Sequence, residues 1–346
     1  MRTFSGGGIH KRRVFDLKFE NVVSMENLLA AWEEFFAGKR KKPDVLKFKE
    51  DLLINIRLLH NDLVAHRYEH GSYYHFVVKD PKRRDIHKAS VRDRLLHHAI
   101  HRKLYPLFDR IFVADSFSCR IGKGTHNAMN RFRVMHRNVS QNNTKTCRVL
   151  KLDIRKFFAS IDHDILLSLL YNWIPDLELM WLFERIISSF SALDSQRGLP
   201  LGNLTSQLFA NVYLHELDAF VKYQLRAKNY IRYADDFVLL SSSQEELKKY
   251  LDAIRTVLAD QLRLTLHPKK IELRTISSGV DFLGWIHFPS HRILRTSTKN
   301  RMIRRHRTDL SEHVHFSYLG MVGHGNTHEL QIALANEYWL FGEKDF

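Results

Sequence analysis

Two adjacent carboxylates between apolar runs constrain this chain more than any other feature. Residues 229–241 read NYIRYADDFVLLS, and the runs on either side of Asp235 and Asp236 have the length and composition of strands. Asp is common at tight corners, so the segment predicts a β-hairpin with antiparallel strands. Adjacent carboxylates repel each other, which raises a pKa unless a cation lies nearby. The hairpin therefore indicates either a divalent-metal site or ordinary turn chemistry.

A further carboxylate ends another expected strand. Residues 148–153 largely alternate polar and apolar side chains, and the pattern then changes to that of a helix. If this strand neighbours the hairpin, Asp153 meets Asp235 and Asp236, and together they could hold two Mg²⁺ ions, with Mn²⁺ as a substitute. Such a pair suits phosphoryl transfer, because one ion lowers the pKa of an attacking 3′-hydroxyl and the other neutralises the leaving pyrophosphate.

Helical and strand-like patterns are interleaved along the rest of the chain. The spacing of apolar residues predicts helices over residues 24–36, 45–63, 90–107, 165–190, 204–225 and 245–262, and strands over residues 73–79 and 280–288. No glycine-rich phosphate-binding fingerprint opens a helix after a strand. Together with the antiparallel hairpin, this favours an α+β fold over a doubly wound α/β fold.

The composition indicates a polyanionic partner. Lys and Arg number 54 against 38 Asp and Glu, giving a formal charge of +16, which favours nucleic acid first and an anionic membrane surface second. A hydrophobic content of 44% argues against disorder. The two cysteines exclude an all-cysteine zinc site. No apolar run approaches the roughly 18 residues of a spanning helix, so we expect a cytoplasmic protein with no membrane partner.

The motifs around these carboxylates resemble, in their order, those of the reverse transcriptases. They are SFSCRIGKGTHNAM (116–129) for the fingertip, KLDIRKFFASID (151–162) for the strand ending in Asp, LGNLTSQLFANVYLHELD (201–218), the YADD hairpin (233–236), LTLHPKKIEL (264–273) with its lysines, and GVDFLGWIHF (279–288) for a primer-gripping hairpin. In addition, DPKRRDIHKASVRDRLLHHAI (80–100) is similar to the basic strand and helix of prokaryotic members.

The resemblance spans about residues 25–330 and implies a right-hand polymerase with fingers, a palm built on an antiparallel sheet, and a helical thumb. The implied domains are a basic lead-in over 1–24, fingers with part of the palm over 25–145, the palm with its catalytic motifs over 146–290, and the thumb over 291–346.

One departure from the usual motif points to a subgroup. Most reverse transcriptases have Gln-Gly and Ser-Pro where this chain has Leu201-Gly202 and Ser206-Gln207. This pattern resembles the enzymes of diversity-generating retroelements, which make error-prone cDNA from a template-repeat RNA. Leu201 offers only apolar contact where the usual Gln can hydrogen-bond near the incoming nucleotide, so we expect lowered fidelity. The alternative is that Leu201 is a packing residue.

The resemblance also implies roles for individual residues. The metal ligands would be Asp153, Asp235, Asp236 and the carbonyl group of Ile154. Lys270 would protonate the leaving pyrophosphate and complete the catalytic set, with Lys269 as the alternative register. The expected nucleotide-binding residues are Lys82, Arg84, Arg120, Phe158, Leu201, Gly202 and Gln207. The expected primer- and template-binding residues are Phe282, Leu283, Gly284, Trp285, Arg301, Arg304 and Arg305.

The implied partners are a template RNA, a DNA or RNA primer with its cDNA, dNTPs, and a small basic oligomeric accessory protein in a prokaryotic cell or a phage-infected host. Two other functions stay open: another stand-alone prokaryotic reverse transcriptase, of the retron or antiviral-defence type, and a catalytically silent RNA-binding scaffold. The Leu-Gly and Ser-Gln pairs argue against the first. The clustered carboxylates argue against the second, because without a cation they would only repel one another.

Overall fold

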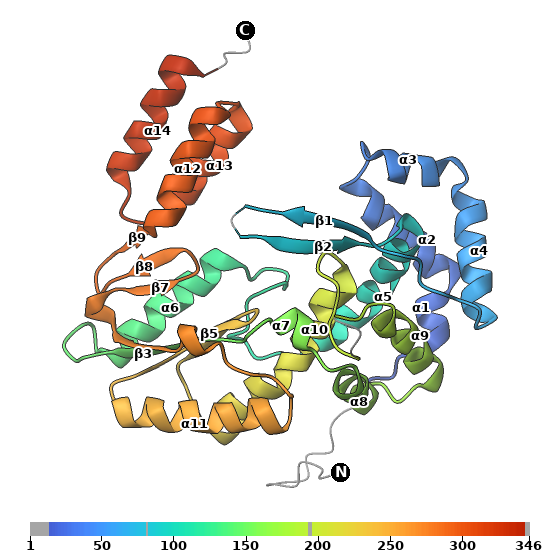
Figure 1. The fold of residues 1–346 in the computed structure, drawn as a ribbon, viewed down its shortest axis with the longest axis horizontal. Coiled ribbons are helices and arrows are strands. Elements are labelled where there is room, and N and C mark those ends of the chain that lie inside the picture. Colours follow the sequence, from blue (N-terminus) through green and yellow to red (C-terminus); the bar gives the residue numbers. More distant parts are fainter. Residues whose placement is uncertain (1–13, 81, 193–195, 343–346) are drawn as a thin grey trace. The chain divides into compact units, whose positions relative to one another are not determined.

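The computed structural model describes residues 14–80, 82–192 and 196–342, and the chain divides into two compact units (Figure 1). Of the described residues, the first unit contains those within 14–113, 155–220 and 256–265, and the second contains those within 114–154, 221–255 and 266–342. Each unit is thus assembled from segments that are distant in the sequence. The described residues form helices and antiparallel sheets, which confirms the expected α+β class.

The first unit is mainly helical. Its helices are α1 (Phe19–Val23), α2 (Met25–Ala37), α3 (Pro43–Glu50), α4 (Leu52–Val64), α5 (Val91–Asp109), α7 (Phe157–Ser160), α8 (His163–Trp173), α9 (Leu177–Ser188) and α10 (Leu204–Ala219). The expected start of α2 is confirmed, because the Ser24 hydroxyl accepts the Asn27 N–H at 3.2 Å. Helix α10 is buried around nearly its whole circumference and packs against α5 and α8, so it forms the centre of this unit.

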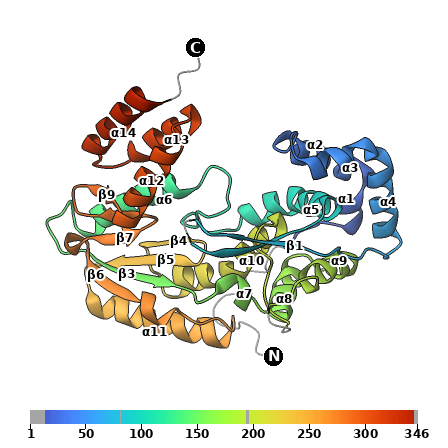
Figure 2. The same cartoon turned by 45° about the horizontal axis from the view of Figure 1, so that its top comes forward.

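A two-stranded antiparallel hairpin extends from these helices (Figure 2). Strand β1 (Tyr74–Val78) pairs with β2 (Arg84–Lys88), with Val78 opposite Arg84. The segment expected to form one helix over residues 45–63 is instead divided into α3 and α4 at Asp51. That residue leaves the helical conformation, with φ −114° and ψ 39°.

The second unit is built on a four-stranded sheet with the strand order β4-β5-β3-β6. The strands are β3 (Arg148–Asp153), β4 (Tyr230–Tyr233), β5 (Asp236–Ser241) and β6 (Glu272–Thr275), all antiparallel to their neighbours. Helix α6 (Thr125–Val139) packs on one face, against Ile231, Val238 and Leu240. Figures 1 and 2 show α11 (Gln244–Asp260) along the other face. Covering on both faces explains why β5 is a continuous apolar run rather than an alternating one.

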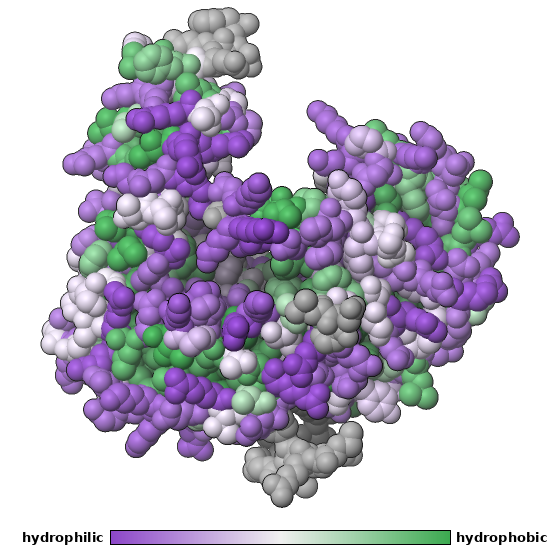
Figure 3. All heavy atoms as spheres, in the orientation of Figure 1, coloured by the Kyte–Doolittle hydropathy of each residue, from purple (hydrophilic) through white to green (hydrophobic). Residues whose placement is uncertain are grey.

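The remainder of the second unit combines a small sheet with three helices. The strands are β7 (Val280–Phe282), β8 (Trp285–His287) and β9 (Arg292–Leu294), and the helices are α12 (Thr296–Thr308), α13 (Glu312–Val322) and α14 (His328–Phe341). Residues 280–288 form two strands because Leu283 and Gly284 turn the chain with φ of 54° and 86°. The face in Figure 3 shows mostly hydrophilic side chains over α12 to α14, with apolar ones among them. Among the described residues, no helix has the length and apolarity to cross a bilayer.

Candidate active site

The end of the four-stranded sheet brings together the carboxylates that the sequence singles out. Strand β3 pairs with β5 so that Asp153 lies directly opposite Asp236. Opposite residues of an antiparallel pair have Cα atoms about 4.5–5.5 Å apart. On the other side of β5, Tyr233 pairs with Asp236, which leaves Ala234 and Asp235 as a two-residue turn. The expected hairpin, and its position beside the strand that ends in Asp153, are therefore confirmed.

The turn is held by a buried arginine. Ala234 has a φ of 55°, a left-handed conformation that two-residue hairpin turns require. The Arg232 side chain is only 1% exposed, and its guanidinium donates to the Ala234 carbonyl at 3.1 Å and to the Ser116 hydroxyl at 3.0 Å. The Ile154 N–H donates to the Asp235 carbonyl at 3.2 Å, which ties the end of β3 to the turn. Arg232 is not among the site residues predicted from the sequence, although a charged residue in an otherwise apolar strand is a usable signal.

The carboxyl group of Asp236 has a buried oxygen that accepts no hydrogen bond from the described residues. Its Oδ1 atom is shielded from solvent and has no hydrogen-bond partner within the described part of the chain. Burial raises the pKa of Asp236 to about 7, with the charges of Asp153 and Asp235 adding to the increase and the Lys151 ammonium opposing it. A buried acceptor without a donor costs free energy, so this group is suited to receive a cation or a proton.

Lys270 contacts the opposite carboxylate. Its ammonium lies 2.8 Å from Asp153 Oδ2, and the Lys270 side chain is 41% exposed while the Asp153 side chain is 15% exposed. The short turn over Pro268–Lys270 is fixed to β3 by the His267 N–H, which donates to the Asp153 carbonyl at 2.8 Å. The contact distinguishes the two lysines of the motif: Lys270, not Lys269, reaches the carboxylate.

The donor atoms at this end of the sheet can be compared with the needs of a divalent ion. Within the described ranges, no three His, Cys, Asp or Glu side chains are gathered as a metal-binding group. The chemistry of the donors nevertheless fits magnesium, which prefers carboxylate oxygens. Asp153 and Asp236 lie opposite each other at the end of the sheet, and Asp236 Oδ1 is buried with no hydrogen-bond donor among the described residues. An ion held by Asp153 Oδ2 would compete with the Lys270 ammonium, which lies 2.8 Å from that oxygen.

The expected phosphate-binding cations occupy two different elements. Lys82 and Arg84 are exposed, and Arg84 lies where β2 begins beside the end of β1. Arg120 belongs to the second unit. Its guanidinium donates to the Ser116 carbonyl at 3.0 Å and so stabilises the loop that carries both residues. Phe158 lies in α7 of the first unit, half-buried, with its ring 5.5 Å from the ring of Phe157. The roles expected for these residues stay predictions.

The Leu201-Gly202-Asn203 turn is clamped onto strand β2. The His87 N–H donates to the Leu201 carbonyl at 2.9 Å, and the Asn203 amide donates to the His87 carbonyl at 3.0 Å. Gly202 has a φ of 112°, and a Cβ atom placed there would lie 2.9 Å from Ile86 Cγ2. Gln207 follows in the first turns of α10 and is half-buried. The backbone of the turn, more than its side chains, therefore fixes its position on the hairpin.

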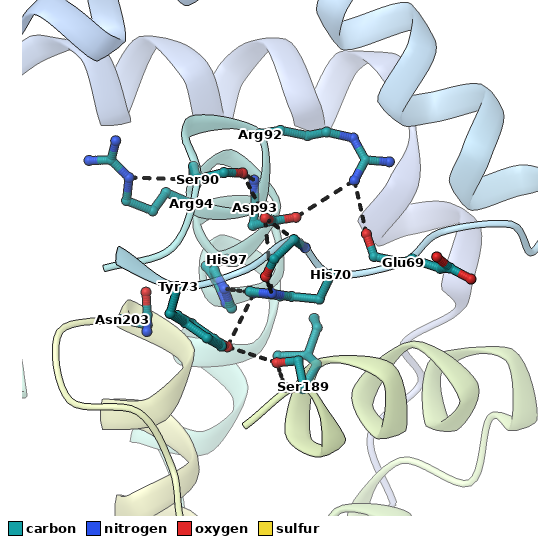
Figure 4. A network of polar contacts seen from close by, with 12 residues as sticks. Glu69, His70, Tyr73, Ser90, Arg92, Asp93, Arg94, His97, Ser189 and Asn203 are labelled. Atoms are coloured by element: carbon teal, nitrogen blue, oxygen red, sulfur yellow. Dashed lines mark hydrogen bonds and ion pairs between the residues drawn. The ribbon is translucent and has the colours of Figure 1, made fainter. Parts of the chain in front are cut away.

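A buried polar network supports the start of α10 (Figure 4). His97 Nδ1 lies 2.6 Å from the Thr205 hydroxyl, and His97 Nε2 lies 3.1 Å from His70 Nε2. The Tyr73 hydroxyl, 3.3 Å from the same His70 nitrogen, extends the network. Asp93 closes it by accepting hydrogen bonds at 2.9, 3.1 and 2.6 Å from the Tyr68 hydroxyl, the Gly71 N–H and the Ser90 hydroxyl. None of these residues is among the site residues predicted from the sequence.

Two of the four expected primer-binding residues in the sheet of β7, β8 and β9 are buried, so their side chains are not free to contact a primer. The side chains of Phe282 and Trp285 are buried, at 0% and 3% exposure, within the cores around α6 and α12. Leu283 and Gly284 form the turn between them, so contact with a primer would fall to this turn. A role for the turn itself stays a prediction.

The arginines between residues 292 and 307 lie in more than one element. Arg292 lies in β9, and Arg295 precedes α12 and pairs with Asp281. Arg305 pairs with Asp309 at 3.2 Å. Arg301, Arg304 and Arg305 share one face of α12, as their spacing indicates, while Met302 and His306 are buried. Their contact with nucleic acid stays a prediction.

Comparison with known proteins gives matches over most of the chain. Residues 78–287 match the sequence model of the family described as "Reverse transcriptase (RNA-dependent DNA polymerase)". Protein YkfC of Escherichia coli (strain K12) is 22% identical over 289 residues, which cover 72% of this chain and 73% of that protein. The group II intron-encoded protein LtrA of Lactococcus lactis subsp. cremoris is 21% identical over 290 residues, covering 62% of this chain and 47% of that protein.

Among solved structures, apo telomerase from Candida tropicalis, truncated from its C-terminal domain, matches with a TM-score of 0.45 and 12% identity, covering 68% of this chain and 57% of that chain. The protein spans about half the length of LtrA and of the telomerase chain.

Proposed function

We propose that this chain, a member of the reverse transcriptase family of RNA-directed DNA polymerases, carries out nucleotidyl transfer at Asp153, Asp235 and Asp236. The match over residues 78–287 establishes the family. Family membership confirms the expected right-hand polymerase fold and implies an RNA template, a primer and dNTPs. The observation that supports the proposed site most directly is the pairing of Asp153 with Asp236 beside the turn that carries Asp235.

The chain's own residues supply charge and position. Asp153, Asp235 and Asp236 would hold two Mg²⁺ ions, and the chemistry these ions would supply is polarisation of the 3′-hydroxyl and the triphosphate. Arg232 and the Ile154 N–H keep the turn at the end of β3, so Asp235 and Asp236 are positioned before substrate arrives. The Lys270 ammonium, which pairs with Asp153 in the structure, would donate a proton to the leaving pyrophosphate.

We further propose roles in nucleotide binding for the residues that the resemblance singles out. Lys82 and Arg84 are exposed cations at one end of the β1–β2 hairpin, where they can bind the triphosphate. Arg120 is a further candidate from the second unit. Phe158 would exclude a ribose 2′-hydroxyl, and the clamped turn carrying Leu201 and Gly202, followed by Gln207, would contact the base pair being formed.

The test is primer extension on an RNA template with magnesium. The double variant Asp235→Asn/Asp236→Asn removes two charges with little change in shape, and Asp260→Asn, an exposed carboxylate in α11, serves as a matched control. We expect cDNA output from the double variant to fall by at least about 10³-fold, as for removal of a principal electrostatic element, and output from the control to be unchanged. Unaltered cDNA output from the double variant would favour a catalytically silent RNA-binding scaffold.

The pairs Leu201-Gly202 and Ser206-Gln207 support the diversity-generating subtype. In this proposal the enzyme copies a template-repeat RNA with frequent errors opposite adenine, because Leu201 gives no polar check on a mispaired nucleotide. A retron or antiviral-defence enzyme is the closest rival. Product sequencing decides the fidelity claim: Leu201→Gln should lower misincorporation opposite adenine several-fold, about the effect of one hydrogen bond. An unchanged error spectrum would assign Leu201 to packing.

The proposal also includes a cytoplasmic setting and a small basic oligomeric accessory protein, on which cDNA synthesis would depend. Co-purification of such a protein with the full chain, and a rise in cDNA yield when it is added back, would test this part. The same primer-extension assay serves as the readout.

A further inference from the structure

A pocket of about 270 Å³ lies in the second unit and includes none of the residues proposed for catalysis. It is formed where α6, the turn between β8 and β9, and the loop between α13 and α14 meet. Two arginines and several histidines line it, together with Phe, Pro, Ser, Gly and Asn. No Asp or Glu is among these lining residues, so the pocket carries positive charge without a compensating acid.

The two arginines are close to each other. Arg133 projects from α6, and its charge, after burial, lowers the pKa of the Arg292 guanidinium. Arg292 donates through Nε to the His324 carbonyl and through Nη2 to Asn130 Oδ1 at 3.3 Å. Its Nη1 atom is shielded from solvent and has no hydrogen-bond partner among the residues the structure describes. A covered guanidinium nitrogen without an acceptor is costly, and an anion would satisfy it.

Two of the histidines, His136 and His287, add polarity more than charge, because burial lowers the pKa of each. Burial lowers the pKa of His287 to about 4, and its Nε2–H donates to the Phe282 carbonyl at 3.2 Å. Burial also lowers the pKa of His136, whose Nε2 lies 2.9 Å from Asn143 Oδ1. The positive charge facing the pocket therefore comes chiefly from the arginines, whose planar forks match the oxygens of a phosphate.

The wall of the pocket is set by close backbone packing. A Cβ atom on Gly325 would lie 2.0 Å from the Trp285 ring and 2.9 Å from the Arg292 carbonyl, so only glycine fits there. The next N–H, of Asn326, donates to the Arg292 carbonyl at 2.8 Å. Since the loop is fixed against β8 and β9, the pocket is formed before any ligand arrives. Its volume is just below the roughly 300–1,000 Å³ of sites for drug-sized ligands, which suits a small group.

We propose that this pocket binds a single phosphate group through Arg133 and Arg292. The group comes either from the backbone of a bound nucleic-acid strand or from free phosphate or pyrophosphate. The site is separate from the polymerisation chemistry, so binding there does not depend on the proposed catalytic residues.

The experiment compares Arg133→Gln with Arg137→Gln in the full-length protein. Both residues are exposed on α6, and only Arg133 lines the pocket. One arm measures the shift of the unfolding temperature with inorganic phosphate or pyrophosphate, with EDTA present so that the carboxylate site holds no metal. The other measures the dissociation constant of an RNA–DNA hybrid by fluorescence anisotropy over a range of salt concentrations.

Either source gives a distinct result. If free phosphate stabilises the wild type and Arg137→Gln but not Arg133→Gln, the pocket takes a free anion. If only Arg133→Gln weakens hybrid binding, by about ten-fold and with a salt slope lower by about 0.9, the pocket takes a strand phosphate. The proposal is overturned if Arg133→Gln behaves like Arg137→Gln in both arms. Loss of cDNA synthesis in other variants has no bearing on these readouts.

Discussion

The close packing of Gly202 against strand β2 makes a substitution there informative. Its φ of 112° lies outside the range that L side chains ordinarily adopt, and an added Cβ would lie 2.9 Å from Ile86 Cγ2. Hydrogen bonds on either side, from His87 to Leu201 and from Asn203 to His87, prevent the turn from moving away freely. Gly202→Ala must therefore strain the backbone and also displace Ile86 or break the clamp.

The two costs can be estimated separately. The left-handed backbone costs about 1–2 kcal/mol for an L residue, and overpacking costs about 1–3 kcal/mol, so Gly202→Ala should destabilise by about 2–5 kcal/mol. Gly122→Ala is the matched control, because Gly122 has a φ of 71° and nothing within 4 Å of its added Cβ. Only the backbone cost applies there.

Urea unfolding measures the free energy of unfolding of Gly202→Ala and of Gly122→Ala, and primer extension gives a functional readout. Adding Ile86→Ala to Gly202→Ala removes the clashing methyl group, so the double variant should recover about 1–3 kcal/mol relative to the sum of the single changes. The reasoning is refuted if Gly202→Ala costs no more than Gly122→Ala, or if Ile86→Ala gives no relief.

Two further predictions concern single charged or titrating groups. Lys270→Gln should lower the rate of cDNA synthesis by about 10²–10⁴-fold. It should change the free energy of unfolding by at most about 1 kcal/mol, because the ion pair of Lys270 with Asp153 is partly exposed. A large loss of stability in urea would contradict this. Burial lowers the pKa of His97 to about 3 and that of His287 to about 4, from an ordinary 6.5. Between about pH 4 and about pH 6.5, both groups are therefore mostly neutral in the folded chain and mostly protonated in the unfolded chain. Stability should therefore fall as the pH drops from about 6.5 toward about 4, by about 1.4 kcal/mol per pH unit for each histidine, and His97→Asn should reduce the measured slope by about one proton.

The core of the proposed site could be predicted because its signals are local. The apolar runs around Asp235 and Asp236 fix a hairpin by themselves, and the alternation before Asp153 fixes a strand end. Only the pairing of β3 with β5 required a long-range assumption, and the structure confirms it.

The supporting contacts could not be predicted, because they join residues that are far apart. Arg232 and Ser116 are separated by 116 positions, and His97 and Thr205 by 108. The burial of Trp285 likewise depends on Gly325, on a later loop that no local pattern connects to it. The division into two units shows the same effect, because each unit combines segments that are separate in sequence.

The central claim is that Asp153, Asp235 and Asp236 together bind divalent cations, and counting bound Mn²⁺ by electron paramagnetic resonance tests it most directly. The variant Asp153→Asn/Asp236→Asn removes the paired carboxylates of β3 and β5, and Asp260→Asn controls for the loss of a surface charge. We predict that the wild type and the control bind Mn²⁺ equally and that the double variant loses this binding. Equal Mn²⁺ binding by all three proteins would contradict the account.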